Sequence, residues 1–193
     1  ATNAAGAALG IKDFADIAKH KDALEGKIYG IEPGNDGNRL ILERITNDDF
    51  GMSAFELVES SEQGMLSQAM KMDADGKPVV FLGWEPHPMN AAMDLTYLTG
   101  GEEWFGAEGS VFTNTRKGFV AECPNTGKLL QNMTFTLAME NEIMGAILND
   151  GTDPTEAAKA WLAANPTAWE GWLNGVTTKD GGDAKAAVTA ALQ

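Results

Sequence analysis

Apolar residues in the first half of the chain switch repeatedly between helical and strand spacing. A recurrence every three or four positions predicts a helix, and alternation or an unbroken apolar run of strand length predicts a strand. The predicted helices cover residues 11–24, 40–45 and 61–72, and the predicted strands cover residues 27–31, 54–60 and 79–82. This alternation favours a largely parallel sheet covered by helices. Residues 1–10 are small, and we expect a loop or a frayed segment there.

The second half of the chain is predicted to be richer in helices. Strands are expected at residues 93–98 and 111–115. The glycine pair Gly100-Gly101 lies between them and indicates a boundary between lobes. Helical periodicity then covers residues 129–148, with a break near 132–134, and residues 154–162 and 183–192.

One stretch combines a buried strand with a side chain suited to binding. Residues 79–82 form an unbroken apolar run, Gly83 ends it, and Trp84 follows beside a backbone stiffened by two prolines. Ligands of open α/β sheets lie at the carboxyl ends of the strands, so the indole of Trp84 is well placed to meet one. Trp84 could equally close the end of the core, and spacing alone does not separate these two interpretations.

The turn at residues 33–38 follows a predicted strand and precedes a helix. Loops of this kind carry ligand contacts in many α/β proteins. Gly34 and Gly37 allow a close approach to the backbone. Asn35 and Asp36 are therefore candidates for a ligand contact, but either residue can also cap the helix.

Composition and charge narrow the class of function. The 193 residues suit one domain or two small lobes, and 44% apolar content can bury a sizeable core. The net charge of −14 argues against a nucleic-acid or anionic-membrane partner. No apolar run approaches the length of a transmembrane helix, and the first residues show no signal-peptide pattern, as in a mature or truncated product.

Residues suited to catalysis or metal binding are few. Cys123 is the only cysteine, and His20 and His87 are the only histidines. We expect no disulfide within the chain, no metal site and no cofactor, because two distant histidines and one thiol do not match zinc-ligand spacing. An enzyme using Glu85 and His87 stays an alternative, but it lacks any nucleophile–base spacing.

Several continuous blocks of the sequence resemble one family of transport proteins. They include EPGNDGNRLI, PVVFLGWEPHPMN, GFVAECPN and MENEIMG, and with others they cover almost the whole chain. Together they resemble the substrate-binding proteins of ABC importers for choline and glycine betaine, most closely the periplasmic choline-binding proteins. The resemblance implies a two-lobed α/β fold of the type II periplasmic-binding-protein kind, with a parallel-rich sheet flanked by helices. It also implies a protein that delivers its ligand to an ABC permease in the inner membrane and catalyses nothing.

The resemblance assigns roles to particular residues. In that family a cage of aromatic rings holds the trimethylammonium group by cation–π attraction and apolar contact. Trp84 in FLGWEPHP matches a cage tryptophan, and Asn35 in EPGND matches the amide that reaches the hydroxyl or carbonyl oxygen of the ligand. Asp36 and His87 are secondary candidates. Choline is favoured over glycine betaine, whose carboxylate would call for backbone N–H groups or a basic side chain.

The resemblance also implies how the chain is divided. Residues 1–93 match one ligand-binding lobe, and residues 94–193 match the C-terminal part of a second, incomplete lobe that is rich in helices. Family members begin with an additional segment that supplies most of the cage and the expected disulfide partner of Cys123. We therefore expect impaired ligand binding unless a complementing N-terminal segment or a second chain completes the cleft. The alternative is an oligomeric structural or interaction module derived from such a receptor, in which another copy covers the exposed apolar surface.

Overall fold

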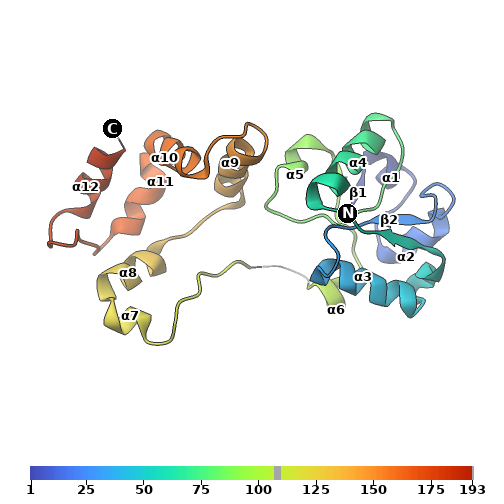
Figure 1. Ribbon diagram of the computed structural model, residues 1–193, viewed down its shortest axis with the longest axis horizontal. Helices are drawn as coiled ribbons and strands as arrows, with labels where there is room; N and C mark the ends of the chain where they lie inside the picture. The colour runs from blue at the N-terminus through green and yellow to red at the C-terminus, as the bar shows by residue number, and fades with distance from the viewer. Residues whose placement is uncertain (107–109, 193) are drawn as a thin grey trace. The chain divides into compact units, whose positions relative to one another are not determined.

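The computed structural model describes residues 1–106 and 110–192 and forms two compact units (Figure 1). The first unit comprises Ala1–Glu85 and Met89–Gly109, and the second comprises Pro86–Pro88 and Ser110–Gln193. The division falls later in the chain than residue 93. The assignment of a ligand-binding lobe to residues 1–93 stays a prediction, and residues 107–109 and 193 of the predicted second lobe lie outside the described residues.

The first unit mixes short strands with helices. Its elements are β1 (Thr2–Asn3), α1 (Ala4–Ala8), α2 (Phe14–Ile17), η1 (Ala18–His20), β2 (Lys27–Tyr29), α3 (Asp36–Thr46), η2 (Asp49–Ala54), β3 (Glu56–Val58), α4 (Glu62–Ala74), α5 (Met89–Ala92), β4 (Leu95–Thr96) and α6 (Glu102–Phe105). Helix and strand alternate through most of this unit, as the sequence predicts.

Among its described residues the second unit is helical. Its elements are α7 (Phe119–Glu122), α8 (Pro124–Asn132), α9 (Leu137–Leu148), α10 (Pro154–Ala164), α11 (Pro166–Trp169), η3 (Glu170–Leu173) and α12 (Ala184–Ala191). The predicted break near residues 132–134 separates α8 from α9. In the part of the chain that the structure describes, no helix combines the length and the apolar character needed to span a membrane.

Backbone hydrogen bonds join the strands of the first unit around residues 79–82. β2 pairs in parallel with β3 on one side. On its other side the N–H of Tyr29 donates to the carbonyl of Val80 (3.0 Å), and the N–H of Leu82 donates to the carbonyl of Tyr29 (2.9 Å). β1 runs antiparallel to residues 79–82 and to β4. The lateral order is β3, β2, residues 79–82, β1 and β4, with the predicted parallel pairing at its centre.

The prediction that residues 1–10 form a loop or frayed segment is wrong. Thr2 and Asn3 are fully buried in β1. The hydroxyl of Thr2 donates to the carbonyl of Val79 (2.8 Å), and the amide of Asn3 donates to the carbonyl of Lys77 and accepts from the N–H of Val79. Small polar side chains supply part of the strand pairing here, so the segment shows no apolar pattern.

The prediction of a strand at residues 111–115 is also wrong. These residues form no regular element, and Val111 and Phe112 are 86% and 76% exposed. A β-branched and aromatic run has strand propensity, but a strand needs a neighbour to pair with its backbone groups. None of the described residues supplies one.

The sheet separates two apolar clusters in the first unit. Val80 belongs to a cluster that contains Ile41 of α3, and Val79 and Phe81 belong to a cluster that contains Met65 of α4. Successive side chains of an extended segment point to opposite faces, so α3 and α4 cover opposite faces of the sheet. This layered packing fixes the ends of residues 79–82 and of β2, where the predicted ligand residues lie.

Candidate ligand-binding site

The turn between β2 and α3 presents Asn35 as the N-cap of the helix. Its backbone is extended, and its side-chain Oδ1 accepts a hydrogen bond from the N–H of Gly37 at 2.7 Å. Such a bond satisfies one of the N–H groups that a helix start leaves without a partner. With Oδ1 bound in this way, the side chain can present its Nδ2–H groups to a ligand. Capping and ligand binding by Asn35 are therefore compatible.

The same turn packs against the end of the central segment of the sheet. A Cβ atom placed on Gly37 would lie 2.8 Å from Cδ2 of Leu82, so the backbone of the turn and this side chain are closely packed. Leu82 lies two residues before Trp84. The structure thus brings the turn that carries Asn35 and the segment that carries Trp84 to one edge of the sheet, the edge at which the parallel strands end.

Asp36 lies on the outer surface of the first turn of α3. Its side chain is 89% exposed and pairs with Nε of Arg39 at 3.3 Å, and Nη1 of Arg39 contacts Glu43 at 2.6 Å. A carboxylate at this position also favours the helix through its macrodipole. These contacts give Asp36 a role in stabilising α3, and a role in ligand binding stays a prediction.

Trp84 is half-buried, with its side chain packed against the apolar cluster that includes Met65, Phe81 and Met89. Its carbonyl accepts a hydrogen bond from Nδ2 of Asn90 at 3.0 Å. Oδ1 of Asn90 in turn accepts from the hydroxyl of Tyr97 at 2.8 Å. The indole is neither sunk in the core nor fully exposed. Asn90 of α5 bonds to the backbone of Trp84, and Tyr97, directly after β4, bonds to Asn90.

The hydroxyl of Tyr97 stays a donor throughout the neutral range. Burial and then the nearby charge of Glu85 raise the pKa of Tyr97 to about 12. A protonated phenol continues to donate to Asn90 at any physiological pH. The hydrogen bond from Tyr97 to Asn90 therefore does not depend on pH in that range.

His87 is only 5% exposed and belongs, with the prolines on either side, to the second compact unit. This burial suits a structural imidazole, and a ligand contact by His87 stays a prediction.

His20 is half-buried in η1, and Cys123 is a half-buried free thiol at the end of α7. Among the described residues no three His, Cys, Asp or Glu side chains are grouped so that they could hold a metal ion.

Sequence patterns did not single out Asn90, Tyr97 or Asn38, which the structure places near the candidate site. Asn38 lies three and seven positions before Ile41 and Ile45, on the apolar face of α3. A polar residue on a buried helix face must find hydrogen-bond partners, and that requirement is the signal that could have found it. Asn90 and Tyr97 follow Trp84 within blocks of the family resemblance, but their spacing carries no local signal.

Comparisons with known proteins match the chain to one family. Residues 2–164 match the substrate-binding domain of the ABC-type glycine betaine transport system. A glycine betaine/carnitine transport binding protein of Listeria monocytogenes is 35% identical over 131 residues, which are 68% of this chain and 43% of that protein. The chain thus spans less than half the length of this curated relative.

Solved structures give the same result. An ABC-transporter choline-binding protein in complex with choline is 63% identical, with a TM-score of 0.87 over 100% of this chain and 68% of that chain. A lactococcal binding protein in its closed conformation with glycine betaine is 28% identical, with a TM-score of 0.71 over 84% of this chain and 62% of that one. These matches confirm the predicted fold class and family, and because the family consists of transport binding domains, they rule out the enzyme that would use Glu85 and His87.

Proposed function

Because the chain belongs to the family of substrate-binding domains of ABC-type glycine betaine transport systems, we propose that it binds choline or a related quaternary ammonium compound for import. The main support is the geometry of one sheet edge, where a half-buried tryptophan and a capping asparagine lie on neighbouring segments. The relative that is 63% identical over the whole chain holds choline.

Trp84 supplies the aromatic surface for the ammonium group. The methyl groups of a trimethylammonium ion are not conventional hydrogen-bond donors, so a ring face that offers both cation–π attraction and apolar contact suits them. Such a contact contributes about 0.5–2 kcal/mol, with the larger values where water is excluded. Packing against the apolar cluster and the Asn90–Tyr97 pair hold this ring in place before the ligand arrives.

Asn35 supplies the polar contact. Its Nδ2–H groups donate to the hydroxyl oxygen of choline, and the bond from Gly37 to Oδ1 sets the orientation of the amide. Choline is favoured over glycine betaine because Arg39, the cation nearest to Asn35 in sequence, is paired with Asp36 and Glu43. A paired guanidinium is a poor partner for the carboxylate of betaine.

Other parts of the transport system complete this function. The cage needs further aromatic rings, which a complementing N-terminal segment or a second copy would supply. The loaded protein would meet an ABC permease in the inner membrane from the periplasm.

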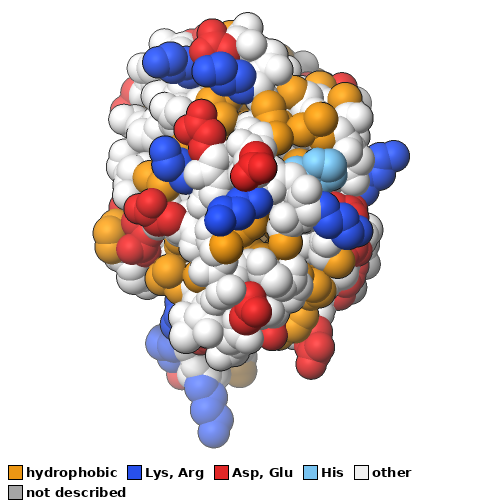
Figure 2. Space-filling view, turned by 90° about the vertical axis from the view of Figure 1, so that its right-hand side faces the viewer, with side chains coloured by type: hydrophobic (Ala, Val, Ile, Leu, Met, Phe, Trp, Pro, Cys, Tyr) orange, Lys and Arg blue, Asp and Glu red, His pale blue; other side chains and the backbone are white. Residues whose placement is uncertain are grey.

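Nucleic acid is not among the expected partners. On the face shown in Figure 2, basic side chains lie among acidic and apolar ones, and the net charge is −14.

An oligomeric interaction module is the second candidate. α9 is largely apolar, yet none of its residues is buried, and Leu137 and Leu148 are exposed on it together with Phe135 just before it. Exposed apolar surface of this kind marks a site of contact with another chain or segment. A protein that associates through this surface and binds no quaternary ammonium compound would fit this second function.

Titration calorimetry with choline, acetylcholine and glycine betaine, combined with a measurement of mass in solution, tests the proposal. We expect heat of binding for choline, weaker heat for betaine, and loss of choline binding at high concentrations of competing tetramethylammonium. Silence with all three ligands, together with a mass that corresponds to several copies, would instead support the interaction module.

A further inference from the structure

We propose that Asn38 is a positioning residue that fixes Asn35 for its contact with the oxygen of the ligand. This inference rests on the proposed function, since it assigns a second residue to the same contact. It concerns a side chain that is fully buried (0% exposed) in the first turns of α3 and that cannot itself touch a ligand.

The amide of Asn38 bonds to two segments at the sheet edge, one after β2 and one after β3. Its Oδ1 accepts from the N–H of Ile31 at 3.0 Å. Its Nδ2 lies 3.0 Å from the carbonyl of Ile31, 3.2 Å from the carbonyl of Glu32 and 3.0 Å from Oε1 of Glu59. The opposite orientation of the amide would set Oδ1 against three acceptors, so the surroundings define which atom is which.

These bonds link Asn38 to Asn35 through one carbonyl group. The carbonyl of Glu32 accepts from Nδ2 of Asn38 and also from the backbone N–H of Asn35 at 3.1 Å. The side chain of Asn35 is held at its other end by the N–H of Gly37. Fixing Glu32 therefore fixes the start of the residue that caps the helix, and with it the direction of the Asn35 amide.

The backbone around Asn38 is shaped for this amide. A Cβ atom on Gly30 would lie 2.4 Å from Oδ1 of Asn38, so glycine is needed where β2 leaves the sheet. The N–H of Ser60 donates to the same Ile31 carbonyl at 3.0 Å, which ties the end of β3 to the same group. An apolar residue of similar size at position 38 would leave the N–H of Ile31 without its acceptor and remove the bonds that join Glu32 and Glu59 to α3, which would free the turn to move.

The proposal predicts a loss of affinity that depends on the oxygen of the ligand. We expect Asn38→Leu to weaken choline binding by roughly five- to tenfold, about the effect of one lost hydrogen bond. Binding of propyltrimethylammonium, which has the same length but lacks the hydroxyl, should change by less than about twofold. In an Asn35→Ala background the Asn38 substitution should have no further effect on choline, because the contact it positions is already gone.

Two further variants control for general damage. Asn38→Asp keeps the size of the side chain and the acceptor for Ile31 but loses both donors, so it should show the same selectivity if the leucine variant does not fold. Asn47→Ala changes an exposed asparagine at the other end of α3 and should leave both affinities unchanged. Equal weakening for choline and propyltrimethylammonium, or an additive loss in the Asn35→Ala background, would overturn the proposal.

Amide hydrogen exchange separates this inference from the proposed function. In Asn38→Leu or Asn38→Asp we expect faster exchange at Ile31, Asn35 and Gly37, with the amides of α4 unchanged. If the wild-type protein binds no quaternary ammonium compound, the proposed function fails, and this local pattern still shows whether Asn38 positions Asn35. Uniform loss of protection across the unit, or no change at the turn, would contradict it.

Discussion

The two compact units differ in the interactions that stabilise them. The first has two apolar clusters on opposite faces of a sheet, with Ile28, Leu57 and Phe81 among the buried residues. Apart from Pro88, the buried apolar side chains of the second, among its described residues, are Ala157, Trp169 and Ala184. Side-chain bonds to backbone hold much of it instead: Nδ2 of Asn132 donates to the carbonyls of Trp172 and Asn174. The comparison shows that a helical apolar pattern predicts helices but does not specify what will cover them.

The largest expected difference between the units follows from truncating one apolar side chain in each. Phe81→Ala empties part of a buried cluster and should destabilise the first unit by about 3–5 kcal/mol. Leu137→Ala removes an exposed side chain of α9 and should change stability by no more than about 0.5 kcal/mol. Urea denaturation followed by circular dichroism measures both values. A cost of several kcal/mol for Leu137→Ala would show that another chain or segment covers α9.

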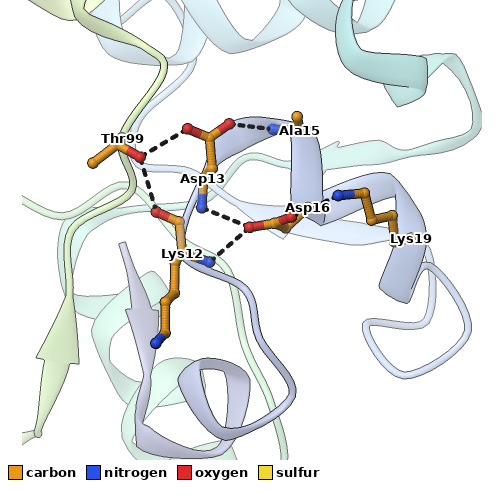
Figure 3. A network of polar contacts seen from close by, with 6 residues as sticks. All are labelled: Lys12, Asp13, Ala15, Asp16, Lys19 and Thr99. Atoms are coloured by element: carbon orange, nitrogen blue, oxygen red, sulfur yellow. Dashed lines mark hydrogen bonds and ion pairs between the residues drawn. The ribbon is translucent and has the colours of Figure 1, made fainter.

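A matched pair of helix caps gives a smaller difference. Asp13 caps α2 through the N–H of Ala15 (2.9 Å), and its other oxygen accepts from the hydroxyl of Thr99 at 2.7 Å (Figure 3). Asp153 caps α10 through the N–H groups of Thr155 and Glu156. Asp153→Ala should cost about 1 kcal/mol, as caps usually do, and Asp13→Ala should cost more because it also removes the bond from the Thr99 hydroxyl to Asp13.

Thermal denaturation of the two cap variants and of Thr99→Val checks this order. In the Thr99→Val background, Asp13→Ala should fall to the cost of an ordinary cap, since the extra contact is already absent. Equal costs for Asp13→Ala and Asp153→Ala in the wild-type background would mean that the bond to Thr99 contributes nothing.

Acidification should lower the stability of the first unit through protonation of Asp16. We expect this effect to be smaller than those of the truncated apolar side chains and of the cap variants. A hydrogen bond from Lys19 and others from the backbone N–H groups of Lys12 and Asp13 lower the pKa of the Asp16 carboxyl below its ordinary value (Figure 3). Its folded-state pKa is depressed, so the contribution to stability is complete above pH 4 or so and is lost as pH falls through the lowered pKa.

Asp16→Asn removes this titration and should flatten the acid limb of the stability curve slightly. Asp22→Asn serves as a control at an exposed carboxylate of the same charge, in the turn after η1. Measuring the unfolding midpoint between pH 2 and 6 compares the two. An identical acid limb in wild type and Asp16→Asn would contradict the assigned role.

The spacing of apolar residues predicted the centre of the sheet in the first unit, but it missed β1 and predicted a strand in the second unit that does not form. The unbroken apolar run at residues 79–82 identified the centre of the sheet, because burial on both faces leaves that signature. β1 escaped detection because Thr2 and Asn3 pair through polar side chains. Residues 111–115 had strand propensity without a neighbour. Strand formation depends on residues distant in sequence, which spacing within one segment does not report.

The candidate site shows the same limit. Trp84 and Asn35 were predicted as ligand residues because each ends or follows an element at a place where ligands bind in α/β proteins, and the family resemblance favoured both. Three neighbouring side chains bond to groups that local spacing does not indicate: Asn38 to the carbonyl of Glu32, Asn90 to the carbonyl of Trp84, and Tyr97 to the side chain of Asn90. Only the folded chain reveals these partners.

Calorimetry with choline on Trp84→Ala and Trp169→Ala tests the central proposal most directly. Trp169 is buried, and its Nε1 donates to the carbonyl of Leu162 at 2.8 Å, so its loss should lower stability while the folded protein keeps its affinity. Trp84→Ala should abolish choline binding while the protein stays folded. Equal affinity for choline in the wild-type protein and the Trp84 variant would contradict the assignment of this indole to the ligand.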